Sequence, residues 1–75
     1  MPEEQFEFGL APMYRILKKG GAERASEGAT IELAKILDQA GIEIGKRAAE
    51  LAIHAGRKTI KAEDIKLASK YVIKS

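Results

Sequence analysis

The chain has 75 residues, with no Cys and one His, and its formal net charge is +2. A domain of this length obtains only about 3–5 kcal/mol from its own core, and the absence of Cys excludes disulfides and thiolate metal sites. Hydrophobic residues make up 45% and charged residues 32%, with no apolar run long enough for a membrane span and no signal-peptide pattern. We therefore expect a soluble, intracellular protein that is stabilised by association with a second chain.

The charge is unevenly distributed along the sequence. Residues 1–9 form an acidic N-terminal extension that contains Glu3, Glu4 and Glu7 and no base. Residues 10–75, the single predicted domain, hold all 13 basic residues and eight acids, a net charge of about +5. A basic body of this size is compatible with binding to nucleic acid, and equally with a Lys-rich surface that only meets solvent.

Breaking and capping residues predict three helices. Pro12 suits the first turn of a helix that continues to about residue 19, where Gly20 and Gly21 end it. Ser26 is a good N-cap for a second helix, which meets no strong breaker before Gly56. A third helix is predicted from about residue 61 or 62 to residue 72. Because no strand-like alternation is present, the sequence predicts an all-α chain with a short–long–short order of helices.

The long helix predicts a dimer. About 29 residues correspond to ~43 Å of helix, whereas a compact globule of 75 residues is only ~29 Å across. Its apolar residues recur at i+3 and i+4 and extend beyond one face: Leu33, Leu37, Ala40, Ile44, Ala48, Leu51 and Ala55, flanked by Ile31, Ile36, Ile42 and Ile53. Small residues beside them would let another helix cross closely: Ala34, Gly41, Ala48 and Ala52. Two short helices cannot cover this surface, so we expect an obligate dimer.

Several segments resemble archaeal histones. Residues 54–65, HAGRKTIKAEDI, resemble the second loop and the start of the third helix of that family. Residues 10–18, residues 21–26 and residues 33–37 resemble its first helix, its first loop with the following cap, and its long helix. The match covers about residues 8–72. It implies the histone fold, in which two chains clasp head to tail and the first loop of each lies beside the second loop of the other.

The resemblance also implies sequence-independent binding, bending and wrapping of double-stranded DNA by a chromosome-associated protein of the cytoplasmic nucleoid. Arg24 is expected to enter a minor groove, and Lys58 and Thr59 are expected to hold phosphates. Arg15 and Lys18 would serve a central site at the N-termini of the first helices. The complete set of candidate DNA contacts is Arg15, Lys18, Arg24, Arg57, Lys58, Thr59 and Lys61. The alternative is that these charges are only solvated loop residues.

Two further roles follow from the resemblance. Arg57 is expected to pair with Asp64 and so to fix the second loop. Four positions match the surface through which one histone dimer stacks on the next: Leu51, His54, Asp64 and Leu67. Alternatively, His54 is simply a favourable charge near a helix C-terminus, and Asp64 a favourable charge in a first helical turn. A metal site would need ligands that the chain lacks.

Some features depart from the family or exclude other classes. Family members often carry Arg at three positions that are apolar or uncharged in this sequence, namely Thr30, Ile42 and Ile53, and the acidic extension is atypical. We therefore expect weaker DNA affinity, or an extension that competes with DNA for the basic face.

The sequence has no catalytic constellation and no phosphate-binding Gly-rich loop, so we expect no enzyme activity, cofactor or small-molecule substrate. The alternative function is a histone-fold module that heterodimerises, with a paralogue for example, inside a larger complex and binds little DNA.

Overall fold

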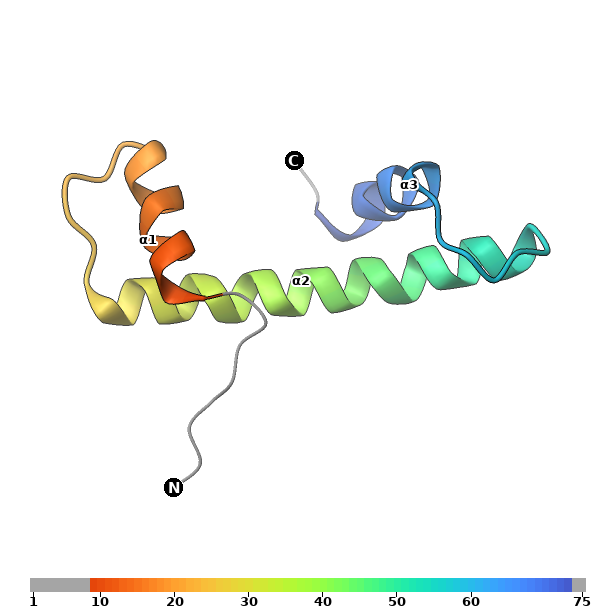
Figure 1. The fold of residues 1–75 in the computed structure, drawn as a ribbon, viewed down its shortest axis with the longest axis horizontal. Helices are drawn as coiled ribbons and strands as arrows, with labels where there is room; N and C mark the ends of the chain where they lie inside the picture. Colours follow the sequence, from red (N-terminus) through yellow and green to blue (C-terminus); the bar gives the residue numbers. More distant parts are fainter. Residues whose placement is uncertain (1–8, 74–75) are drawn as a thin grey trace, which may run out of the picture. The chain divides into compact units, whose positions relative to one another are not determined.

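The structure is a computed structural model that describes residues 9–73 (Figure 1). Three helices are present: α1 (Leu10–Lys19), α2 (Glu27–His54) and α3 (Ala62–Val72). No strand occurs within residues 9–73, so the predicted all-α, short–long–short order is confirmed. The acidic residues of the extension lie outside the described residues. In the part of the chain that is described, no helix combines the length and the apolar character needed to cross a membrane.

The end of α1 is set by a glycine with a positive φ angle. Gly21 has φ 112°, and its N–H donates to the carbonyl of Lys18 at 3.0 Å. The next N–H, that of Ala22, donates to the carbonyl of Leu17 at 3.1 Å. These two bonds form a Schellman motif, which satisfies carbonyls that the end of the helix would otherwise leave without a donor. The predicted stop at Gly20 and Gly21 is therefore confirmed.

The end of α2 has the same motif. Gly56 has φ 76°, and its N–H donates to the carbonyl of Ile53 at 2.9 Å. The N–H of Arg57 donates to the carbonyl of Ala52 at 2.8 Å. At the other end of α2, Ser26 is the predicted N-cap. Its hydroxyl oxygen accepts a hydrogen bond from the N–H of Ala29 at 3.1 Å.

The chain divides into two compact units whose boundary falls inside α2, after Asp38. The first unit contains α1 and the N-terminal part of α2; α1 begins next to α2 and runs away from it at a steep angle in Figure 1. Its buried side chains are those of Met13 on α1 and of Thr30 and Ala34 on α2. The hydroxyl of Thr30 donates to the carbonyl of Glu27 at 2.7 Å, so this buried polar group is satisfied within its own helix.

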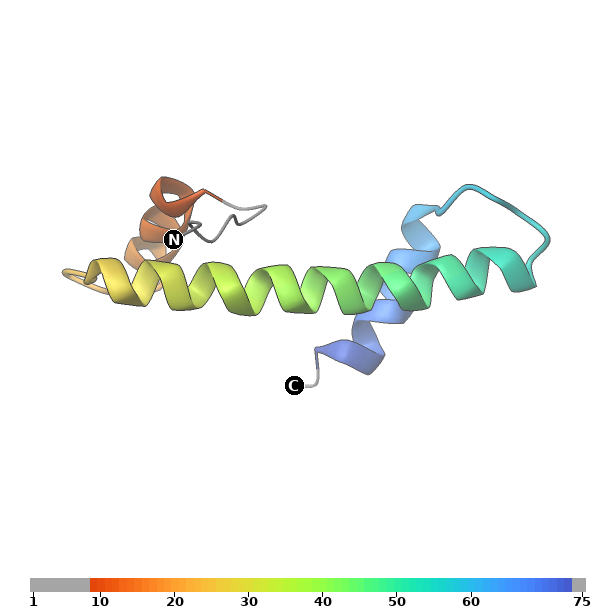
Figure 2. The same ribbon diagram turned by 90° about the horizontal axis from the view of Figure 1, so that it is seen from below.

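The second unit contains the rest of α2 and α3, which crosses it in Figure 2. Ala48 and Ala52 on α2 and Ala68 on α3 are buried, and these small side chains let the two helices approach closely. The guanidinium carbon of Arg47 lies 5.0 Å from the centre of the Tyr71 ring, so a cation–π contact also joins α2 to α3.

Most of the large apolar side chains are left uncovered by these contacts. Among the described residues, Met13 is the one large side chain that is fully buried, and the other buried apolar residues are all Ala. Four residues of the predicted stripe on α2 are only half-buried: Leu33, Leu37, Ile44 and Leu51. The isoleucines beside the stripe at positions 36, 42 and 53 are more than half exposed. A core of one Met and four Ala is too small to stabilise three helices, which is the physical reason to expect a partner chain.

Candidate nucleic-acid interface

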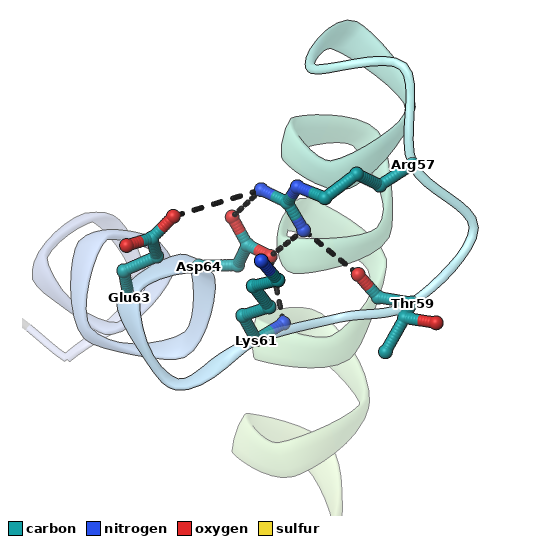
Figure 3. A network of polar contacts seen from close by, with 5 residues as sticks. All are labelled: Arg57, Thr59, Lys61, Glu63 and Asp64. Atoms are coloured by element: carbon teal, nitrogen blue, oxygen red, sulfur yellow. Dashed lines mark hydrogen bonds and ion pairs between the residues drawn. The ribbon is translucent and has the colours of Figure 1, made fainter.

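The loop between α2 and α3, residues 55–61, is called L2 here, and a polar network closes it (Figure 3). Nη1 of Arg57 donates to the carbonyl of Thr59 at 2.8 Å and to Oδ2 of Asp64 at 3.0 Å. Nη2 of Arg57 donates to Oδ1 of Asp64 at 3.2 Å and lies 3.8 Å from Oε2 of Glu63. The Arg57–Asp64 pair is therefore bidentate, the arrangement in which an arginine holds a carboxylate most specifically.

Asp64 also caps α3. Its Oδ2 accepts a hydrogen bond from the N–H of Lys61 at 2.8 Å, which satisfies a donor at the start of the helix. The hydrogen bond from Arg57 and the one from the Lys61 N–H lower the pKa of Asp64 below its ordinary value. The hydrogen bond to Asp64 in turn raises the pKa of Arg57. Both side chains are thus charged at neutral pH, and the carboxylate is buried.

These contacts divide the predicted DNA-binding residues of L2 into two kinds. The guanidinium of Arg57 is directed into the loop, so a structural contact occupies most of the donors that could otherwise reach a phosphate. Thr59 contributes its carbonyl to the network, and its side chain points away from it (Figure 3). Lys58 and Lys61 are exposed. L2 therefore presents two lysines on a backbone that Arg57 of the loop and Asp64 of α3 hold in place.

The loop between α1 and α2, residues 20–26, is called L1 here, and it carries one contact that the sequence analysis missed. Nζ of Lys18 donates to the carbonyl of Glu23 and lies 5.7 Å from the centre of the Tyr14 ring. Arg24 and Arg15 are exposed, and neither side chain forms a hydrogen bond or ion pair with any group in residues 9–73. The structure thus leaves Arg15 and Arg24 available for a ligand and places Lys18 against its own loop.

The four predicted stacking residues all belong to the second unit. His54 and Leu67 are exposed and Leu51 is half-buried, so these three side chains are accessible in the single chain. Asp64 differs from them because its carboxylate is buried and accepts three hydrogen bonds from its own chain. Its Oδ1 accepts only one of these bonds, which leaves it capacity for another donor.

Within residues 9–73, no three His, Asp or Glu side chains lie close enough together to hold a metal ion. The charged residues of both loops have no catalytic arrangement either. They are the exposed cations Arg24, Lys58 and Lys61, the exposed acid Glu23, and Arg57, which is paired with Asp64 of α3. Such an arrangement can attract and hold a polyanion, and it offers no nucleophile or general base at a reacting position.

Comparison with known proteins identifies the class of protein. The model of the family described as histone-like transcription factor (CBF/NF-Y) and archaeal histone matches residues 6–68. One subunit of the archaeal histone HAN1 of Thermococcus zilligii is 55% identical over 64 residues, which cover 85% of this chain and 96% of that protein. Probable archaeal histone 3 of Methanocaldococcus jannaschii is 48% identical over 62 residues, which cover 83% of this chain and 92% of that protein.

The three helices and these similarities define a histone-fold protein. The chain belongs to the family of histone-like transcription factors and archaeal histones, and the resemblance inferred from the sequence is confirmed. Histones are structural proteins of the chromosome that package DNA. The expectation that this chain is not an enzyme is confirmed by that membership.

Proposed function

We propose that this histone-fold chain packages DNA as a head-to-tail dimer that binds and bends duplexes without sequence selectivity. In this proposal residues 10–75 act as one histone-fold domain, and residues 1–9 as an acidic extension to it. The observation that carries the proposal is the closed network of L2. Because Arg57 of L2 pairs with Asp64 at the start of α3, the exposed charges of Lys58 and Lys61 are left as a net positive surface on the loop.

The dimer is supported by the large apolar side chains on α2 that the chain itself does not cover. In the head-to-tail arrangement of the family, L1 of one chain lies beside L2 of the other. Arg24 from one chain would then join Lys58 and Lys61 from the other in one basic patch, and each dimer would have two such patches. Arg15, in the middle of α1, would serve a third site between them. Three contacts with phosphates along one face would hold a bent duplex through its backbone.

Salt-dependent DNA binding tests this proposal. If a dimer neutralises about six phosphates, the logarithm of the affinity should fall with the logarithm of the salt concentration with a slope near −5. Arg24→Ala should weaken binding to unrelated duplexes by similar factors and should reduce the slope by about 1 for each phosphate that is no longer neutralised. Lys66→Ala, which removes an exposed charge on α3 outside the assigned residues, is the matched control and should have a smaller effect. A strong preference for one sequence, or unchanged binding by Arg24→Ala, would contradict the proposal.

We also propose that dimers stack on one another along DNA through Leu51, His54, Asp64 and Leu67. The exposure of His54 and Leu67 supports this, since a surface used between dimers must be accessible in each of them. Nuclease digestion of reconstituted complexes should give a ladder with dimer-sized steps. Leu51→Glu should reduce the ladder to the single-dimer fragment, because two carboxylates would meet at the contact, while Leu51→Met should preserve it. A ladder that Leu51→Glu leaves unchanged would place the stacking surface elsewhere.

A heterodimer is the second candidate for the assembly, and one comparison favours it. The Thermococcus relative is named as a subunit of the archaeal histone HAN1. Two departures from the family also weaken the case for strong DNA binding by this chain alone, since Ile42 and Ile53 are exposed where family members often carry Arg. Size exclusion of the pure chain, with and without a duplex, separates the candidates. A dimer that retains DNA at moderate salt supports the homodimeric histone, and a chain that dimerises only with another histone supports the heterodimer.

A further inference from the structure

The middle of L1 is held by a single hydrogen bond. On one side of it, the N–H groups of Gly21 and Ala22 are bound to the end of α1. On the other side, the carbonyl of Ser26 accepts the N–H of Thr30 at 3.2 Å as α2 begins. Residues 23–25, between these two anchors, make no backbone–backbone hydrogen bond within the described part of the chain. The bond from Nζ of Lys18 to the carbonyl of Glu23 is the one that reaches them.

Lys18 is well placed to restrain this segment. Its side chain lies beside Tyr14, one helical turn earlier, and the cation–π contact of 5.7 Å restricts the freedom of the ammonium group. Its own carbonyl accepts the N–H of Gly21, so the same residue is bonded to the loop through both its backbone and its side chain. The Glu23 carbonyl that it holds belongs to the planar peptide unit that also contains the N–H of Arg24. Fixing that plane therefore restricts the direction in which Arg24 leaves the backbone.

We propose that Lys18 is a positioning residue for Arg24 and does not itself hold a phosphate. This inference rests on the proposed function, because it assigns Arg24 to the DNA surface. Lys18 would order L1 in the DNA-free protein. The conformational-entropy cost of ordering the loop would then not reduce the free energy of DNA binding. The charge of Lys18 still contributes to the general field of the basic body, but its specific effect passes through Arg24.

A double-mutant cycle separates a positioning role from a direct contact. DNA affinity is measured for the wild type, Lys18→Met, Arg24→Ala and the double variant at several salt concentrations. If Lys18 acts through Arg24, Lys18→Met weakens binding roughly three- to tenfold in the wild type and has little effect when Arg24 is already Ala. If Lys18 holds a phosphate, the two losses multiply, and Lys18→Met reduces the salt slope in both backgrounds. That second result would overturn the inference.

The order of L1 in the DNA-free protein gives an independent readout. The backbone order parameter of the Arg24 N–H, measured by NMR, should fall in Lys18→Met while the melting temperature stays close to that of the wild type. Tyr14→Leu should lower the same order parameter, since it removes the ring beside the ammonium. Lys19→Met is the matched control, because it removes a neighbouring exposed charge whose side chain forms no hydrogen bond, ion pair or ring contact within residues 9–73. It should leave the Arg24 order unchanged.

An Arg24 N–H that is equally ordered in Lys18→Met and in the wild type would contradict the positioning role, whatever the DNA affinities are. Failure of the proposed function gives a different result, namely a wild-type protein that does not bind DNA although Lys18→Met still loosens L1. The two failures can therefore be told apart.

Discussion

The two loops begin in the same way and are then held by different chemistry. Each starts with a glycine of positive φ and a Schellman motif, Gly21 in L1 and Gly56 in L2. L2 is then closed by a buried carboxylate that binds an arginine fork and caps the next helix. L1 has a serine cap at its exit and one exposed lysine across its middle. An ion-pair network therefore fixes L2, whereas the middle of L1 is held only by the bond from one long, flexible side chain.

The largest effect on stability should come from breaking the network of L2. Asp64→Asn keeps the shape of the side chain but removes its charge, so Arg57 loses its ion pair and the Lys61 N–H keeps only a weaker acceptor. We expect a clear fall in the melting temperature at neutral pH, larger than that of any substitution in L1. Glu63→Gln is the control, because Glu63 is exposed and lies 3.8 Å from Arg57. It should change the melting temperature little.

The effect of Asp64→Asn should also depend on pH. The folded state lowers the pKa of Asp64, so this group stabilises the protein fully above its ordinary pKa of about 3.9. That contribution is lost as the pH falls through the lowered value, where the folded state also takes up the proton. The melting temperatures of Asp64→Asn and the wild type should therefore converge in acid, and a difference that is undiminished at pH 2 would contradict this account. Lys18→Met, which removes no carboxylate, should show no such convergence.

Both loops contain a glycine with a positive φ angle, and replacing it should lower stability less than Asp64→Asn does. The loss of stability should be the same in the two loops. Gly21→Ala and Gly56→Ala should each lower the unfolding free energy by about 1–2 kcal/mol, because both residues have positive φ and an L side chain is strained there. An added Cβ would meet no atom within 4 Å at either position, so the cost is one of backbone conformation and not of a clash. Gly28→Ala, in the first turn of α2, is the control and should cause no loss. Chemical unfolding checks all three variants, and an unaffected Gly56→Ala would show that L2 can be held without its glycine.

Local signals predicted the ends of the helices because each end depends on a few neighbouring residues. Gly21, Gly56 and Ser26 act within one turn of their own position, and the structure places them as predicted. The contact of Arg57 with Asp64 spans seven residues across a loop, and only the resemblance to a family suggested it. The periodicity of a helix or a strand cannot predict a contact between residues that are seven positions apart and separated by irregular backbone.

The contact of Lys18 with Glu23 was missed for a similar reason. It crosses the glycine turn, and the position of the Glu23 carbonyl depends on the φ angle of Gly21, which the sequence does not specify.

The apolar pattern of α2 showed which residues avoid water but not which chain covers them. Within each unit the small side chains of Ala34, Ala48 and Ala52 are buried, while the leucines and isoleucines beside them remain accessible.

The proposed basic patches depend on a histone-fold dimer, since only a dimer brings L1 of one chain beside L2 of another. Thermal unfolding of the pure protein over a hundredfold range of concentration tests it most directly. If the chain is an obligate dimer, the melting midpoint rises with concentration, because folding and association are then one equilibrium. A midpoint that stays constant over the whole range would rule out the obligate dimer, because it would show that the single chain is stable with its leucines and isoleucines uncovered.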